Sequence, residues 1–189
     1  MRWPNVPACY GWLSLDRRGR WRLQGEPVTH QGFIEFINRQ YGCDDAGNWF
    51  LQNGPQRVFV RLERAPWIIH RLGDGNLQTH TGQAVATPHA VYMDEDGALW
   101  IAFEEGVGFL DDRDLAPALE EIHDASGQPP EDNALIAFLE NDTLVANADL
   151  YWRKLPVTKE KRAAMAARFG FNPDPEPGSS SGGKKLSPG

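Results

Sequence analysis

One short phrase occurs three times in this chain and strongly limits the folds that it can adopt. In each copy an Asp is followed three residues later by a Gly, and a short aromatic segment comes directly after the Gly. The copies occupy residues 16–24, 44–52 and, less regularly, 94–101. Gly takes the left-handed backbone conformation that tight turns need, and large rings favour strands, so each copy predicts a β-hairpin. We therefore expect Gly19, Gly47 and Gly97 to close hairpin turns and Trp21 and Trp49 to be buried.

The tryptophans of the three copies carry a second expectation. We interpret Trp21, Trp49 and Trp100 as occupying equivalent places after their turns. Equivalent places predict that each ring packs its hairpin against a helix in the core. The alternative is an aromatic-lined pocket with arginines at its rim.

The order of these elements predicts the fold class. Turn, strand, helix and hairpin follow one another in residues 10–72 and again in residues 90–148, which indicates a tandem duplication. We expect an α+β fold of two similar small units, each made of antiparallel β-hairpins packed on one helix, plus a C-terminal helix. The expected segments are a first β-rich unit (1–72), a connector (73–89), a second unit (90–150), the C-terminal helix (151–172) and a disordered tail (173–189).

Local signals place the individual helices. Thr29 is expected to cap a helix that runs to about Gln40. Gly170 is expected to end the last helix. The other expected elements are helices at about 112–124 and 159–169 and a hairpin of strands at 134–140 and 143–148.

Composition excludes several classes of protein. The chain has 189 residues, of which 41% are hydrophobic, as is typical of a globular rather than a disordered protein. No stretch approaches the roughly 18 apolar residues of a membrane span, and the N-terminus lacks a signal-peptide core, so the expected location is cytoplasmic. Cys9 and Cys43 match no metal or redox spacing and are expected to be reduced thiols, with a disulfide as the alternative if the fold brings their backbones within about 7 Å.

Charge is distributed unevenly along the chain, although the formal net charge is only −7. Residues 1–72 carry ten Arg against six acidic residues, residues 90–150 carry sixteen acidic residues against the single Arg113, and residues 151–189 carry eight basic residues against three acidic ones. The basic and acidic parts are expected to face one another or to form separate solvated surfaces. The alternative is that the Arg-rich part presents a positive patch to an anion. The acidic total and the lack of a known nucleic-acid-binding motif argue against nucleic acid as a partner.

The sequence contains no recognisable catalytic constellation. The acidic turn that begins at Asp94 places Gly97 fourth rather than sixth, so it does not fit a calcium loop of the EF-hand type. The five histidines form no metal-binding pair on a helix, and no serine lies in a nucleophile elbow. We therefore expect no metal, no cofactor and no catalytic residue, and we keep a hydrolase with scattered residues as the least favoured alternative.

A ligand site is expected among the arginines of the first unit. Arg binds carboxylate or phosphate through two parallel hydrogen bonds, and with aromatic side chains it suits a pocket for a small anionic molecule. The expected ligand-binding residues are Arg20, Arg22, Arg57, Arg61 and Trp67.

Four segments of the first unit form a recognisable pattern: residues 19–28 with Gly19, Trp21 and Pro27, residues 33–36, residues 47–51 with Gly47 and Trp49, and residues 60–67 with Ala65, Pro66 and Trp67. This pattern resembles a family of uncharacterised proteobacterial proteins that carries only a domain-of-unknown-function label. The resemblance covers about residues 11–68 and implies a two-part fold of repeated α+β motifs and a role in signal transduction, with no established activity. The chain departs from the family at residues 53–57, where Asn-Gly-Pro-Gln-Arg replaces Thr-Pro-Val-Glu-Lys, and at Arg64, where the family has Asp.

Two main functional hypotheses follow. The first is a non-enzymatic cytoplasmic module that binds a small anionic ligand or a partner in a regulatory role. The second is a protein–protein interaction or scaffold protein that uses the basic C-terminal helix and the tail with Lys184 and Lys185. The sequence assigns neither the ligand nor the oligomeric state.

Overall fold

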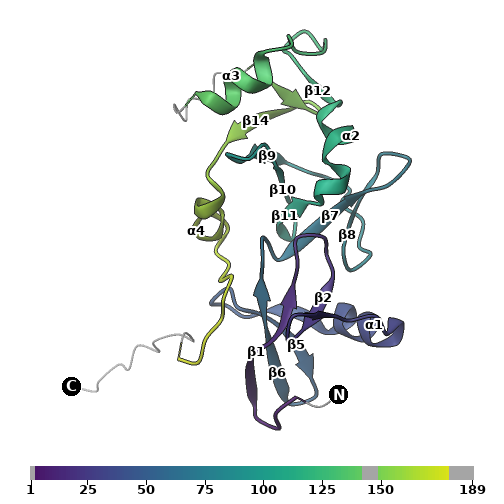
Figure 1. Cartoon of the computed structure of the whole chain (residues 1–189), viewed down its shortest axis with the longest axis vertical. Coiled ribbons are helices and arrows are strands. Elements are labelled where there is room, and N and C mark those ends of the chain that lie inside the picture. Colours follow the sequence, from purple (N-terminus) through teal and green to yellow (C-terminus); the bar gives the residue numbers. More distant parts are fainter. Residues whose placement is uncertain (1–2, 142–148, 179–189) are drawn as a thin grey trace, which may run out of the picture.

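Two curled β-sheets and four α-helices make up the part of the chain that the computed structural model describes, residues 3–141 and 149–178 (Figure 1). The molecule is elongated, with the first sheet at one end and helix α3 (Ala134–Glu140) at the other. This is the α+β class that the sequence predicts. Within those residues, no helix is long and apolar enough to cross a membrane.

The first sheet has six strands in the order β3-β2-β1-β6-β5-β4. Helix α1 (Gln31–Gln40) packs against it and fully buries Ile37. The expected helix is confirmed, but its N-cap is His30 rather than Thr29, because Nδ1 of His30 accepts a hydrogen bond from the backbone amide of Phe33 at 3.1 Å. The strands are β1 (Ala8–Leu15), β2 (Trp21–Leu23), β3 (Glu26–Pro27), β4 (Tyr41–Cys43), β5 (Trp49–Asn53) and β6 (Gln56–Leu62).

The second sheet has eight strands in the order β12-β13-β14-β9-β10-β11-β7-β8. Its central strands β10 and β11 are buried over nearly their whole length. The change from one sheet to the other falls between Leu62 and Trp67, inside the expected first unit. The strands are β7 (Trp67–Arg71), β8 (Leu77–Thr79), β9 (Ala90–Met93), β10 (Leu99–Phe103), β11 (Gly106–Leu110), β12 (Ile122–His123), β13 (Tyr151–Trp152) and β14 (Leu155–Lys159).

Two expected helices are shorter than predicted. The region 112–124 contains a 3₁₀ turn (Asp112–Asp114), helix α2 (Leu115–Leu119) and then strand β12. The last helix is reduced to a 3₁₀ turn (Arg162–Ala164) and helix α4 (Met165–Phe169), because β13 and β14 occupy the preceding residues. Gly170 ends α4 with a φ of +67°, as expected.

Residues 134–140 form helix α3, so the prediction of a strand there was wrong. A strand places residues 136 and 138 on one face, whereas a helix separates them. Phe138 is buried and Ile136 is 55% exposed, as the helix requires. The partner strand expected at 143–148 lies outside the described residues.

Three parallel strand pairs join segments that are distant in the sequence, which the hairpin pattern did not predict. β1 pairs with β6, β7 with β11 and β9 with β14. In each pair the earlier strand opens a hairpin, with β2, β8 or β10, and the later strand closes one, with β5, β10 or β13. A parallel partner needs a long crossover, so it leaves no local signal in the sequence.

The expected hairpin turns are confirmed at Gly19, Gly47 and Gly97, whose φ angles are +81°, +81° and +77°. Each turn is closed by two backbone hydrogen bonds, one from the first residue to the fifth and one from the Gly back to the first. The same two bonds recur at residues 72–76, 79–83 and 124–128. The sequence pattern misses the first two of these because Leu and Thr replace the Asp, and the third because no aromatic strand follows it.

Trp21 and Trp49 are buried as expected, and Trp100 is also buried, but Trp100 is not in an equivalent place. It follows Gly97 by three residues, whereas Trp21 follows Gly19 by two. Because successive strand residues face opposite sides, Trp100 takes the place that Arg22 has after the first turn.

The C-terminal segment of residues 170–174, which we call the strap, returns from the second sheet to the first (Figure 1). The backbone amide of Asn172 donates to the carbonyl of Gly47 at 2.9 Å, and that of Leu62 donates to the carbonyl of Pro173 at 2.8 Å. The start of the expected tail is thus bound to the first sheet.

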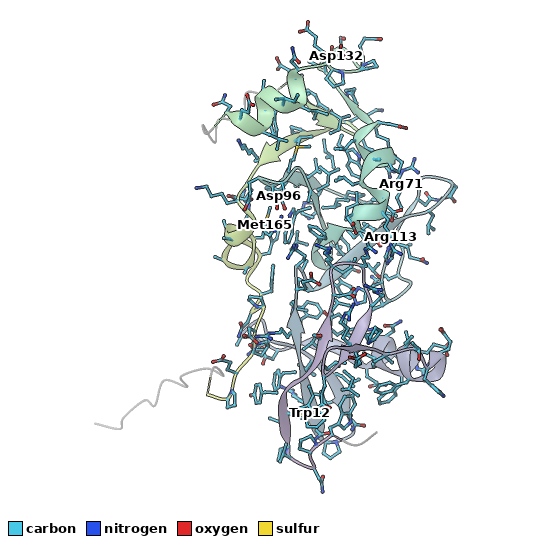
Figure 2. All side chains as sticks on the ribbon, viewed as in Figure 1. Trp12, Arg71, Asp96, Arg113, Asp132 and Met165 are labelled. Carbon is cyan, nitrogen blue, oxygen red and sulfur yellow. The ribbon has the colours of Figure 1, made fainter. Side chains whose placement is uncertain are left out.

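Helix α4 anchors the other end of the strap on the second sheet. Met165 is fully buried, and the guanidinium of Arg162 contacts the carboxylates of Asp94 and Asp96. Figure 2 labels Asp96, which Arg162 contacts, and Met165 of α4. The strap therefore connects the two sheets.

Candidate anion-binding site

Three polar side chains form a row across the first sheet. Ser14 of β1 pairs in register with Arg22 of β2 and with Arg61 of β6. Register partners project from the same face, and adjacent strands lie about 4.8 Å apart, so the Cα atoms of the two arginines are about 10 Å apart with Ser14 between them. Leu13 and Leu15, the neighbours of Ser14, point into the core, so the row faces away from it.

A pocket of about 350 Å³ opens over this row. Its volume lies near the lower end of the range for small-molecule sites. The strap residues Pro173 and Asp174 line one side, so the pocket lies where the strap meets the first sheet. The lining residues are Ser14, Leu15, Asp16, Arg22, Arg61, Leu62, Glu63, Pro173 and Asp174.

The carboxylate of Asp16 positions the first arginine of the row. Its Oδ1 accepts hydrogen bonds from the backbone amides of Arg18 and Arg20 at 3.0 and 2.9 Å. Its Oδ2 accepts from Nε of Arg20 at 2.9 Å and from Nε of Arg22 at 3.0 Å. Burial by itself raises the pKa of Asp16, but these hydrogen bonds outweigh burial and hold the pKa below its ordinary value. One ionised carboxylate is therefore shared by two guanidiniums.

The strap holds the second arginine. Nε and Nη2 of Arg61 donate to Oδ1 and Oδ2 of Asp174, both at 3.1 Å. This two-bond geometry is the one that Arg uses to bind carboxylate and phosphate ligands. The side chains of Arg61 and Asp174 are 66% and 49% exposed, so water screens the pair and it contributes little to stability. An oxyanion that enters the pocket can therefore replace Asp174 at small cost.

The positive and negative charges around the pocket balance. Four guanidiniums pair with three carboxylates, and the carboxylate of Glu176 also acts on Arg61, so an anion is favoured by the hydrogen-bond donors of Arg22 and Arg61 and not by net charge. The guanidiniums belong to Arg17, Arg20, Arg22 and Arg61, and the carboxylates to Asp16, Glu63 and Asp174.

The structure separates the remaining expected site residues from the pocket. Arg20 reaches Asp16 at the edge of the pocket, with half of its side chain exposed. The guanidinium of Arg57 lies 4.4 Å from the centre of the Phe50 ring and does not line the pocket. Trp67 is 8% exposed and belongs to the core.

Sequence reasoning missed three residues of this site. Asp16 carried a signal, but as a turn residue. Ser14 carried none, because its role depends on the register of three strands. Asp174 was missed because it was expected in the tail.

A second polar cluster surrounds His70. Its Nδ1 lies 3.2 Å from Oδ2 of Asp111 and 3.8 Å from Oδ2 of Asp114, a set of atoms that suits a metal ion. Nε and Nη2 of Arg113, however, already contact Oδ1 and Oδ2 of Asp111 at 3.1 and 2.5 Å. Oδ1 of Asp111 also caps the 3₁₀ turn that follows. The cluster is therefore best explained as a set of structural ion pairs.

His80 lies in an aromatic cluster between the sheets, with its ring centre 5.3 Å from that of Trp21 and 5.8 Å from that of Trp67. Burial, and then the neighbouring His70, lower the pKa of His80 to about 3. Its Nδ1 accepts a hydrogen bond from the amide of Ile68 at 3.2 Å. His80 is thus neutral near pH 7 and packs as a core side chain.

The basic residues of the last helix contact acidic residues of the same chain. Arg162 contacts Asp94, and Nη1 of Arg168 lies 3.0 Å from Oε2 of Glu160. These pairs do not favour a partner surface on the described part of this helix. The tail lysines lie outside the described residues.

A comparison with known protein families assigns the sequence to one family. The family model DUF2944, described as "Protein of unknown function (DUF2946)", matches residues 1–176. The chain belongs to this family. The sequence predicted a relation to a family of unknown function, and this match confirms that prediction. No curated protein matches this DUF2944 chain.

Two solved structures of DUF1285 family proteins are similar to part of the DUF2944 chain. The protein from Silicibacter pomeroyi DSS-3 gives a TM-score of 0.47 at 15% identity, over 61% of this chain and 71% of its own. The protein from Shewanella baltica OS155 gives a TM-score of 0.42 at 20% identity, over 56% of this chain and 87% of its own. Neither similarity assigns an activity to the DUF2944 chain.

Proposed function

We propose that this protein is a non-enzymatic module that binds a small oxyanion, such as a phosphate or a carboxylate, on its first sheet. The observation that carries the proposal is the strand register that places Ser14 between Arg22 and Arg61 below a pocket of about 350 Å³. The hydroxyl of Ser14 can donate one hydrogen bond, and Arg61 can donate two in parallel once Asp174 is displaced. Arg22 contributes Nη2, because its Nε and Nη1 already donate to Asp16 and to the carbonyl of Gly25.

A regulatory role is consistent with the position of the pocket. Asp174 lies on the strap, and the strap connects the first sheet to the second. A ligand that displaces Asp174 from Arg61 therefore acts on the contact between the two sheets. The three parallel pairs, each between hairpins, support the further proposal that the fold is a repeated α+β unit.

Titration with inorganic phosphate tests the proposal. We expect saturable shifts of the Nε–H signals of Arg22 and Arg61 in ¹⁵N NMR spectra and a rise in melting temperature. Arg61→Gln removes a charge-assisted pair of hydrogen bonds and is expected to weaken phosphate binding by about tenfold or more.

Arg57→Gln is the matched control. Arg57 lies on the same strand four residues before Arg61, on the same face but outside the pocket lining. We expect this variant to bind phosphate as the wild type does. Equal loss in both variants shows only a general charge effect and contradicts the proposal, as does the absence of saturation. A parallel titration with malonate distinguishes phosphate from carboxylate ligands.

A further inference from the structure

A second and larger pocket, of about 560 Å³, lies against the second sheet. It is bounded by the β7–β8 hairpin, the extended segment 84–88 and the turn between β13 and β14. Apolar side chains line much of it, together with Asn76 and Gln78, and a single guanidinium, that of Arg153, reaches it. The apolar side chains on which the argument rests are Leu72, Ala84, Ala86, Pro88 and Leu155.

The backbone at Arg153 disfavours the residue that occupies it. Arg153 and Lys154 form the two-residue turn between β13 and β14, with φ angles of +47° and +69°. A side chain with a Cβ is strained in this left-handed region, where Gly is favoured. Lys154 shares this conformation without lining the pocket, so the turn alone assigns no role to Arg153, whose guanidinium lies 4.6 Å from the centre of the Trp152 ring and lines the pocket.

The charge of Arg153 is only partly neutralised. Arg71 donates from Nε to Oε1 of Glu121 at 2.6 Å, and Arg153 also donates to the carboxylate of Glu121. Nη2 of Arg153 further donates to the carbonyl of Gly75 at 2.5 Å. One carboxylate between two guanidiniums leaves one positive charge in excess. Among the described residues, the hydrogen bonds of Arg153 use Nε and Nη2, so Nη1 is available for a ligand.

We propose that this pocket binds an amphipathic monocarboxylate, with its carboxylate on Arg153 and its hydrocarbon chain along the apolar wall. Leu72 is 38% exposed, and Ala84 and Ala86 are exposed as well, so a hydrocarbon chain removes apolar surface from water on both sides of the contact. The chemistry differs from that of the Arg22–Ser14–Arg61 row, which offers two guanidiniums and a hydroxyl beside a smaller apolar wall. The two sites are thus expected to differ in how strongly their affinity depends on the length of the hydrocarbon chain.

Calorimetric titration with butanoate, hexanoate and octanoate tests this proposal on the full chain. Each buried methylene is expected to raise the affinity by up to about fourfold, so octanoate binds most tightly. Octanol, which has the same chain without the charge, is expected to bind about tenfold more weakly than octanoate.

Two pairs of variants separate the ligand from the fold. Arg153→Gly suits the left-handed backbone and removes the guanidinium, so we expect a folded protein that loses octanoate binding by about tenfold or more. Lys154→Gly relieves the same kind of strain at an exposed residue outside the pocket lining and is expected to bind octanoate normally. Ala86→Glu places a like charge in the pocket and is expected to abolish binding, whereas Thr87→Glu, outside the lining, is not.

Octanoate binding that is equal in the wild type, Arg153→Gly and Ala86→Glu overturns the proposal. So does the absence of any octanoate binding at millimolar concentration, or binding that does not depend on chain length. Arg61→Gln is expected to leave the dependence of binding on chain length unchanged, because that dependence comes from the apolar wall of the second pocket. If octanoate binding is lost in Arg61→Gln and retained in Arg153→Gly, the carboxylate binds at the first site and the second site is refuted.

Discussion

Two hairpin turns of this molecule have the same backbone hydrogen bonds but different side-chain surroundings. The turns that begin at Asp16 and at Asp94 are closed by the same pair of backbone hydrogen bonds, and in each the Asp caps the amides of the turn. Six residues after the Asp, however, the first turn has Arg22 and the second has Trp100. Both side chains donate to Oδ2 of their Asp.

The residue six places after the Asp, Arg22 or Trp100, goes with different surroundings of the two carboxylates. Asp94 is fully buried and accepts hydrogen bonds from Nε1 of Trp100 at 2.9 Å and from Nε of Arg162 at 3.3 Å. Asp16 instead holds guanidiniums that reach solvent beside a pocket. One turn thus contributes to the core, and the other positions a candidate ligand site.

Removal of the two carboxylates is expected to show this difference most strongly. Asp94→Ala leaves the indole N–H of Trp100 and the charge of Arg162 without their buried partner, so we expect a loss of about 3–5 kcal/mol in the free energy of unfolding. Asp16→Ala is expected to cost about 1–2 kcal/mol, since water can solvate the freed guanidiniums. Urea unfolding followed by tryptophan fluorescence measures both. Equal losses contradict the comparison.

The glycines of two turns provide the next test. A Cβ added at Gly47 lies 2.1 Å from the carbonyl oxygen of Gly170 on the strap, whereas at Gly97 the nearest atom is Cδ1 of Leu139 at 3.6 Å. Gly97→Ala is expected to cost about 1–2 kcal/mol through its positive φ alone. Gly47→Ala is expected to cost about 2–4 kcal/mol, because the strap must also move.

Hydrogen exchange reports whether the strap is responsible for the difference. We expect faster exchange of the Asn172 amide in Gly47→Ala, because this amide donates to the carbonyl of Gly47. The Gly97→Ala variant is the control and is expected to leave that amide protected. Unchanged protection in both variants excludes displacement of the strap as the cause.

The features that the sequence predicts correctly are those with local causes. The turns at Gly19 and Gly47 follow from the conformational freedom of Gly within four residues, and helix α1 follows from its apolar spacing. The predicted equivalence of Trp21 and Trp100 was wrong because Trp100 lies one residue farther from its turn glycine. A shift of one residue moves a side chain to the other face of a strand.

The candidate site was only partly predictable for a related reason. Arg22 and Arg61 were expected as ligand residues because of their side-chain chemistry. Their placement on both sides of Ser14 depends on the parallel pairing of β1 with β6, and Asp174 joins them only because the strap returns to the first sheet. No local pattern contains either relation, since both depend on the packing of distant segments.

Release of Arg61 from the strap is expected to have a smaller effect, and in the opposite direction. Asp174→Asn removes the anion that competes for Arg61, and exposed pairs of this kind contribute about 0–1 kcal/mol, so phosphate affinity is expected to rise by up to about fivefold. Asp45→Asn removes the same charge from a turn outside the pocket and serves as the control. If Asp174→Asn leaves the affinity unchanged, Asp174 does not compete with the ligand.

The dependence of stability on pH gives the smallest effect and concerns the Asp16 turn alone. Burial raises the pKa of Asp16, but the hydrogen bonds from Arg18, Arg20 and Arg22 lower it below the ordinary value. A lowered pKa in the folded state means that ionised Asp16 stabilises the protein above the unfolded pKa of about 3.9 and that this contribution is lost as the pH falls through the folded pKa. The difference in unfolding free energy between the wild type and Asp16→Asn is therefore expected to be constant above about pH 5 and to shrink below about pH 4. A difference that stays constant to pH 2 contradicts the ionic role of Asp16, and the turn is then held by its backbone hydrogen bonds alone.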